Sequence, residues 1–96
     1  MGHPEHDGPV VESVLRALRL LECFRRGEPE LSLAELVRRS GYSKSTTHRL
    51  LNTLRVGGWL ERTPTSTFRL SIRSFQTGSI LVESLDVTRV APPLLT

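Results

Sequence analysis

Few features of this 96-residue sequence would direct it to a membrane or out of the cell. It contains one cysteine, so no disulfide can form within the chain, which fits a reducing cytoplasm. No apolar run approaches the roughly 20 residues of a membrane-spanning helix. The first ten residues, MGHPEHDGPV, hold neither a basic nor an apolar segment and are not a secretory signal. We therefore expect a cytoplasmic protein whose residues 1–10 form a disordered leader.

Groups of residues that support catalysis are also absent from the sequence. It has no set of nucleophile, base and acid, no Gly-rich phosphate loop and no cluster of metal ligands. His3 and His6 form a pair without a third ligand, which is a poor metal site. Cys23 has Arg19 and Arg26 as helical neighbours; because cations lower a thiol pKa, a redox role stays open beside that of an incidental thiol. The sequence predicts no enzyme activity, no cofactor and no metal.

Acidic residues are almost absent from one part of the chain. Residues 38–73 carry eight Lys and Arg against Glu61 alone, a net charge of +7, whereas the whole chain carries +3. Such a block repels itself unless it meets a polyanion such as nucleic acid. A solvated basic surface is the alternative that charge alone leaves open.

Hydrophobic spacing predicts a first helix over residues 13–26. Ser13 has the position of an N-cap, and Gly27 follows the last turn. The residues expected to face the core are Val14, Ala17, Leu18, Leu21 and Phe24. Leu15 and Leu20 widen the apolar surface beyond one stripe, which suggests that a second subunit covers part of it.

A second, shorter helix is predicted over residues 33–39. Ser32 and Glu35 in SLAE match a capping box, in which the serine accepts the N–H of Glu35 and the glutamate reaches back. Gly41 ends this helix, because a tight reversal favours a residue that tolerates positive φ. A turn and a further helix follow.

The third predicted helix, capped by Ser43 and ending near Val56, has two different faces. At about 100° per residue, the face turned to the core holds Thr47, Leu50, Leu51 and Leu54. The opposite face carries no acid; its residues are Ser45, His48, Arg49, Asn52 and Arg55. Arginine can donate a fork to guanine, asparagine can pair with adenine, and hydroxyls can contact base or phosphate. This face therefore suits duplex DNA.

The segment WLERTPTSTFRLS predicts two short strands joined by a loose loop. Phe68 and Leu70 would share one face of the hairpin, and Arg69 would point to the other. A helix is predicted next, in RSFQTGSILVESL. Trp59 and Phe75, like Phe68, are expected to pack rather than to stack on bases.

Together these elements predict a mostly α winged helix-turn-helix fold with a small β-hairpin wing. The third helix would enter the major groove of duplex DNA, with Arg49 and Asn52 at base edges. The residues expected at phosphates are Ser32, Lys44 and Thr46. Arg62 and Arg69 are the expected wing contacts.

Parts of the sequence resemble the N-terminal domain of the isocitrate lyase regulator (IclR) family of bacterial transcription factors. The similar segments are SVLRALRLLECF, LSLAELVRRSGYSKSTTHRLLNTLRVGGWLER and FRL, and the most specific stretch is LAELVRRSGYSKSTTHRLLNTL. The resemblance covers residues 11–96. It implies that the residues at the DNA include Lys44, Ser45, Thr46, His48 and Arg49. Val37 and Thr47 stand where the family often has Ala and Val, and Ser71 stands where it commonly has Gly.

The resemblance also implies a domain organisation and partners. Family members join a winged helix-turn-helix to a larger C-terminal effector-binding domain and form dimers or tetramers. We accordingly expect a DNA-binding domain over residues 11–72. Residues 73–96 would be a linker helix and the start of an effector-binding domain that is missing here. The expected partners are a double-stranded operator, further copies of the chain in a homodimer or homotetramer, and a small-molecule effector.

Two other functions fit a basic winged helix. It could be a protein–protein interaction module whose basic block meets an acidic partner. RNA binding is disfavoured, because no aromatic-studded sheet is available to stack bases.

Overall fold

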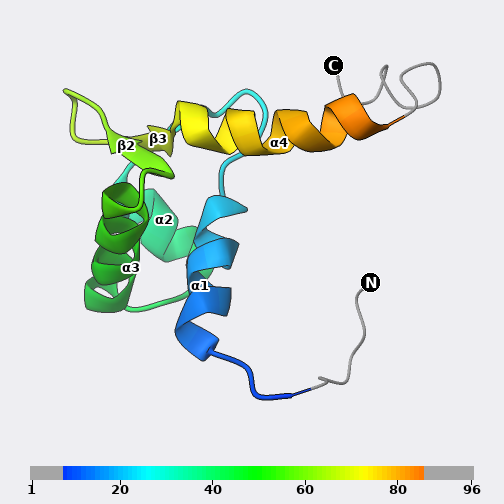
Figure 1. Cartoon of the computed structure of the whole chain (residues 1–96). Helices are drawn as coiled ribbons and strands as arrows, with labels where there is room; N and C mark the ends of the chain where they lie inside the picture. The colour runs from blue at the N-terminus through cyan, green and yellow to red at the C-terminus, as the bar shows by residue number, and fades with distance from the viewer. Residues whose placement is uncertain (1–7, 86–96) are drawn as a thin grey trace.

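The computed structural model describes residues 8–85, which fold into four helices and a three-stranded sheet (Figure 1). The elements are α1 (Glu12–Leu21), β1 (Glu30–Leu31), α2 (Leu33–Ser40), α3 (Lys44–Val56), β2 (Leu60–Arg62), β3 (Phe68–Leu70) and α4 (Ile72–Ser84). This is the mostly α winged helix-turn-helix that the sequence predicts. Most of the predicted leader, and residues 86–96 of the predicted linker, lie outside the described residues.

The first helix is shorter than its hydrophobic spacing predicts. α1 begins at Glu12 without a side-chain cap, so Ser13 is not the N-cap, and the helix ends at Leu21. Gly27 has a φ of 83° but lies in a separate turn, closed by the N–H of Glu28, rather than at the helix end. The prediction was wrong because apolar residues continue beyond the point where the backbone leaves the helix.

Only part of the face predicted for residues 13–26 packs on the core, where Leu21 and Phe24 are partly buried. Leu20 is fully buried and Cys23 is 8% exposed, whereas Val14 and Leu18 are 54% and 48% exposed. Burial raises the pKa of the Cys23 thiol, so the structure contradicts a thiol activated by neighbouring arginines.

The helix-turn-helix has the boundaries that its caps predict. The Oγ of Ser32 accepts the backbone N–H of Glu35 at 3.1 Å, and the Oγ of Ser43 accepts that of Thr46 at 3.1 Å. Between the two helices Gly41 has a φ of 78°, in the left-handed region. These local interactions fix where α2 ends and α3 begins.

The wing contains a strand that the sequence did not predict. β1 pairs antiparallel with β3, which gives the sheet order β1-β3-β2. Residues 63–67 connect β2 to β3, with the N–H of Thr63 on the carbonyl of Thr67 at 2.8 Å and Ser66 at a φ of 66°. The predicted loose loop is confirmed. Phe68 and Leu70 share one face of β3 as predicted; Phe68 is buried in the core, and Leu70, at the end of the strand, is 43% exposed.

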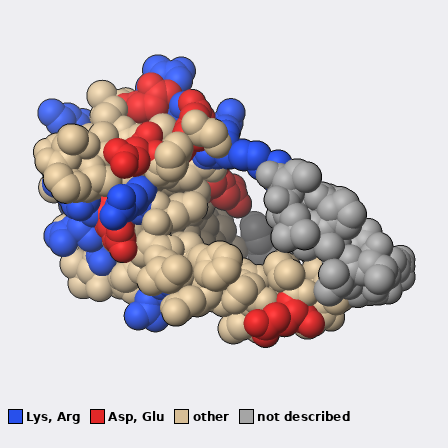
Figure 2. Space-filling model, turned by 90° about the horizontal axis from the view of Figure 1, so that it is seen from above, with Lys and Arg blue, Asp and Glu red and all other residues tan. Residues whose placement is uncertain are grey.

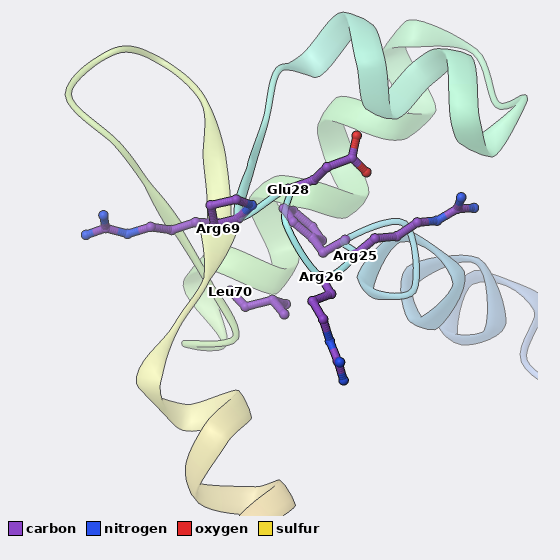
Figure 3. A pocket seen from close by; sticks show the side chains of 7 residues that line it. Arg25, Arg26, Glu28, Arg69 and Leu70 are labelled. Atoms are coloured by element: carbon purple, nitrogen blue, oxygen red, sulfur yellow. The ribbon is translucent and has the colours of Figure 1, made fainter. Parts of the chain in front are cut away.

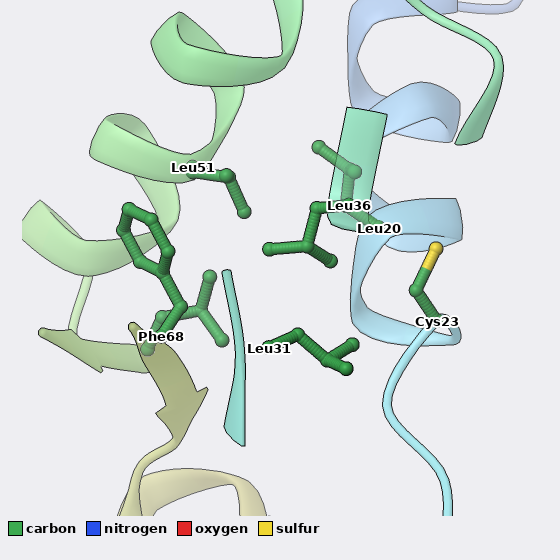
Figure 4. Close-up of a cluster of buried hydrophobic side chains, with 7 residues drawn as sticks. Leu20, Cys23, Leu31, Leu36, Leu51 and Phe68 are labelled. Atoms are coloured by element: carbon green, nitrogen blue, oxygen red, sulfur yellow. The ribbon is translucent and has the colours of Figure 1, made fainter. Parts of the chain in front are cut away.

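The hydrophobic core lies where the first three helices meet the sheet (Figure 4). Its buried residues are Leu20, Cys23, Leu31, Leu36, Leu51, Leu60 and Phe68. Thr47 is fully buried beside them, and Leu50 and Leu54 are half-buried, as predicted for the inner face of α3. The core thus orients α3 with its polar face outward.

α4 extends away from this core, and none of its residues is buried (Figure 1). Ser71 caps the N-terminus of α4. Its Oγ donates to the carbonyl of Gly58 and accepts the N–H of Arg73. Phe75, which was predicted to pack, is 68% exposed. Within the described residues, every helix is too short or too polar to span a bilayer.

Candidate nucleic-acid interface

The outer face of α3 is exposed along its length and carries no acidic side chain. All five residues predicted for this face are exposed: Ser45, His48, Arg49, Asn52 and Arg55. The opposite face buries Thr47 and Leu51 in the core. A helix of 13 residues is about 20 Å long, enough to lie in a major groove. The predicted assignment of the two faces is confirmed.

The side chains on this face differ in whether they already form hydrogen bonds or ion pairs within the protein. Within residues 8–85, Lys44, His48 and Arg49 have no side-chain hydrogen bond or ion pair. The Nη2 of Arg55 donates to the Oδ1 of Asn52 at 2.7 Å. Bidentate pairing with adenine needs that oxygen to accept. Arg49 is therefore ready to contact a base. Asn52 Oδ1 accepts one bond from Arg55 and keeps a second lone pair for a base.

The beginnings of α2 and α3 lie beside each other. Ser32 and Lys44 line one hollow, together with Leu33, Ala34 and Val37. Backbone N–H groups at a helix start attract anions, and Lys44 adds a full positive charge. The Ser32 hydroxyl accepts a backbone N–H and so keeps its own proton to donate. The structure brings two of the predicted phosphate contacts together; the third, Thr46, is half-buried in the first turn of α3.

The two predicted wing contacts lie on opposite faces of the sheet. The guanidinium of Arg62 stands 5.1 Å from the ring centroid of Phe68, at the edge of the face that covers the core. The Nε of Arg69 donates to the Oε1 of Glu61, directly across on β2, at 3.0 Å. The structure therefore does not bring Arg62 and Arg69 to one surface.

Folding neutralises part of the basic block. Arg38 and Arg39 both bind the carboxylate of Glu35, and Arg39 also binds Glu28 at 2.8 Å. Hydrogen bonds from Arg38 and then Arg39 lower the pKa of Glu35 from 4.5 to about 2, and the hydrogen bond from Arg39 lowers that of Glu28. Glu35 therefore holds arginines rather than completing the predicted capping box.

Within residues 38–73, most of the positive charge that stays unpaired lies on the predicted interface. In the described part of the chain, the cations of residues 38–73 without an acidic partner are Lys44, Arg49, Arg55, Arg62 and Arg73. All except Arg73 belong to α3 or to the wing. In the view of Figure 2 some basic groups lie beside acidic ones and others stand alone. The net charge of residues 38–73 therefore overstates the number of cations available to a ligand. Most of those that stay unpaired lie on α3 and the wing, where DNA is expected.

Another basic hollow lies between the wing and the segment that follows α1 (Figure 3). Its lining is Phe24, Arg25, Arg26, Glu28, Pro29, Arg69 and Leu70. Figure 3 shows the side chains of Arg25, Arg26 and Arg69 pointing away from one another. Glu28 is bound to Arg39. Because its donors do not converge, this hollow is not suited to hold an anion.

The core, the turn and the wing define a winged helix-turn-helix domain, a class of protein whose second motif helix enters the major groove of duplex DNA. The sequence profile described as the IclR helix-turn-helix domain matches residues 13–64. The chain belongs to the IclR family of transcriptional regulators.

Two curated relatives match most of this chain. HTH-type transcriptional regulator XynR of Escherichia coli (strain K12) is 35% identical over 89 residues, which are 92% of this chain and 35% of that protein. Transcriptional repressor IclR of the same strain is 30% identical over 86 residues, which are 88% of this chain and 31% of that protein. The chain thus spans about a third of the length of these relatives.

Solved structures agree with this membership. The crystal structure of an IclR family transcriptional regulator from Brucella abortus has a TM-score of 0.76 and 30% identity, over 98% of this chain and 36% of that chain. An IclR homolog from Microbacterium hydrocarbonoxydans, complexed with 4-hydroxybenzoate, has a TM-score of 0.65 and 28% identity, over 68% of this chain and 27% of that chain.

Proposed function

We propose that residues 11–72 form the sequence-specific duplex-DNA-binding domain of a bacterial IclR-type transcriptional regulator. α3 would lie in the major groove. The observation that carries this proposal is the outer face of α3, which is exposed, free of acid and rich in unpaired cations. Duplex DNA carries one negative charge per roughly 1.7 Å, so such a face gains by counterion release. One similar protein is named a repressor, which favours repression by occupation of an operator.

The predicted site residues take different parts in this complex. Arg49 and Asn52 contact base edges, and Ser45 and His48 lie beside them in the groove. The residues at phosphates are Ser32, Lys44 and Thr46. Arg62 and Arg69 contact the backbone or minor groove next to the wing. The shared hollow of Ser32 and Lys44 supports the phosphate contacts, and the free guanidinium of Arg49 supports its base contact.

Two further partners belong to the proposal. Apolar side chains stay exposed on α1 and α4, which supports a homodimer or homotetramer on a two-fold-related site. A small-molecule effector would bind a C-terminal domain, reached through the linker of residues 73–96, in the part of the relatives' length that this chain does not span. The 4-hydroxybenzoate complex of a similar protein supports such an effector.

The proposal includes no enzymatic reaction, no cofactor and no metal. It rests on the class of the relatives, which are transcriptional regulators. A regulator of this kind acts in the bacterial cytoplasm, where the operator is accessible.

Selection of bound duplexes from a random pool, at moderate salt, tests the proposal. Enrichment of a motif with two related half-sites is the expected result, and the spacing of the half-sites would report the dimer geometry. Retention without enrichment would leave only phosphate attraction and refute sequence-specific binding. If the protein retains no duplex at all, the domain is instead assigned as a protein–protein interaction module.

A further inference from the structure

The wing loop contains a chain of hydroxyl groups that ends on a carboxylate. The Oγ1 of Thr63 lies 3.1 Å from that of Thr65 and 2.6 Å from that of Thr67. The Oγ1 of Thr67 in turn donates to the Oε1 of Glu30 at 2.8 Å. Glu30 lies on β1, the strand that the sequence did not predict, and is 37 residues away along the chain.

The carboxylate of Glu30 fixes the direction of every proton in this chain of hydroxyls. An ionised carboxylate only accepts, and a threonine hydroxyl has a single proton to donate. Thr67 gives its proton to Glu30, so it accepts from Thr63. Thr63 then has no proton left for Thr65, so Thr65 donates to Thr63. The backbone N–H of Thr67 reaches Thr63 at 3.2 Å, which completes the hydrogen bonds of this buried hydroxyl.

Thr65 consequently presents lone pairs, and not a proton, to its surroundings. Its side chain is exposed on the loop that protrudes beyond α3 (Figure 1). While it donates to Thr63, this hydroxyl has no proton for a phosphate oxygen. Nor can it donate to adenine N3 or thymine O2, which are acceptors in the minor groove. The donor that the minor groove does offer is the N2 amino group of guanine.

We infer that Glu30, acting through Thr67 and Thr63, is a positioning residue that sets Thr65 as a hydrogen-bond acceptor for guanine in the minor groove. This inference rests on the proposed function and adds a base preference beside the site that α3 reads. Arg62 lies on the same hairpin and has no acidic partner among the described residues. Where it contacts phosphate, it carries no sequence information of its own. Thr65 therefore supplies the discrimination at the wing.

The test uses duplexes that keep the selected core half-sites and randomise the flanks. Four proteins are compared: the unchanged chain, Thr67→Ser, Thr67→Val and Thr65→Val. Thr67→Ser keeps the hydroxyl chain. Thr67→Val removes its link to Glu30, so Thr63 can donate to Thr65 and the proton of Thr65 is set free. Thr65 is exposed, so Thr65→Val tests the acceptor without disturbing the buried hydroxyls.

The unchanged chain and Thr67→Ser are expected to prefer G·C at one flanking position by about two- to tenfold, the range of one net hydrogen bond. Both valine variants should lose this preference and keep the core half-sites. Replacing that guanine by inosine, which lacks only the amino group, should weaken the unchanged chain by the same factor and leave the valine variants unaffected.

Two results would overturn the inference alone: equal flank preferences in all four proteins, or core recognition by the unchanged chain without any flank preference. A failure of the unchanged chain to retain any duplex would instead overturn the proposed function. The experiment therefore separates an error about the wing from an error about DNA binding.

Discussion

The side chain of Thr47 is fully buried beneath α3, and its hydroxyl has no hydrogen-bond partner among the described residues. A buried polar group without a partner costs about 1–3 kcal/mol. Thr47→Val replaces this hydroxyl by a methyl group of similar size. We expect urea unfolding to show a gain of about 1 kcal/mol, the low end of that range. Duplex affinity should not change, because the residue faces the core.

Thr47→Ser is the matched control, since it keeps the hydroxyl and removes the methyl. It should be less stable than the unchanged protein, because it leaves a cavity beside Leu51 and the rest of the core. A loss of stability in the valine variant would mean that a bound water satisfies the hydroxyl.

Arg49 has no partner within the described residues and stands on the outer face of α3. Arg49→Ala is expected to cost about 1–3 kcal/mol of binding to the preferred duplex and to relax selectivity at one base position. Fluorescence titration against the preferred duplex and its single-base variants measures both effects. Arg26→Ala removes the same charge outside α3 and the wing, and should leave selectivity intact. If Arg49→Ala weakens every duplex equally, Arg49 contacts phosphate and not a base.

At the scale of the element, Arg39 joins the C-terminal turn of α2 to the segment that follows α1. Glu28 and Glu35 both bind Arg39, which also donates to the carbonyl of Cys23. The pKa of Glu35 is about 2 in the folded protein against an ordinary 4.5. Because folding lowers this pKa, the unfolded chain takes up the proton first as the pH falls. The stabilisation is complete above pH 4.5 and is lost as the pH approaches about 2.

Urea unfolding as a function of pH checks this expectation. The unfolding free energy should fall between pH 4.5 and pH 2, and it should fall less steeply in Glu35→Gln, which has no proton to take up. Glu83→Gln, on α4 and away from the arginine cluster, is the control and should follow the unchanged protein. The same slope in Glu35→Gln and in the unchanged protein would show that other carboxylates dominate acid unfolding.

The elements differ in how far the sequence could predict them, and the difference follows the range of their interactions. α2, its turn and α3 could be predicted because Ser32, Gly41 and Ser43 act on neighbours within three or four residues. β1 could not, because two residues have no periodicity and their partner strand is far along the chain. The end of α1 was misplaced because the apolar residues that set its predicted length continue beyond the helix, which ends at Leu21.

The candidate site shows the same division. The face of α3 follows from helical spacing, so Arg49 and its neighbours were assigned correctly to the exposed side. The pairing of Arg69 with Glu61 depends on strand register, and that of Arg39 with Glu28 depends on tertiary contact. A count of charges in the sequence does not reveal which arginines are paired with carboxylates in the fold. Contact of the site residues with DNA stays a prediction.

At the scale of the whole molecule, the domain leaves two apolar surfaces uncovered. One is on α1, where Val14 and Leu18 are about half exposed, and the other is on α4. On α4, Phe75 and Val82 are two helical turns apart and lie on one face. Exposed apolar residues gathered on a projecting helix are typical of association surfaces. We expect this face to support the homodimer that a two-fold-related operator requires.

The double variant Phe75→Gln/Val82→Gln tests this expectation. Val56→Gln is the control, because Val56 is an exposed apolar residue at the end of α3, away from α4. Sedimentation should show weaker self-association of the double variant only. Its affinity for a duplex with two half-sites should fall tenfold or more, by about 1.4 kcal/mol, because the linked second half-site no longer contributes. Its affinity for a single half-site should not change, since α3 is untouched. Equal losses on both duplexes would place α4 in the DNA contact itself, and no loss on either would assign the dimer to α1 or to a part of the protein beyond this chain.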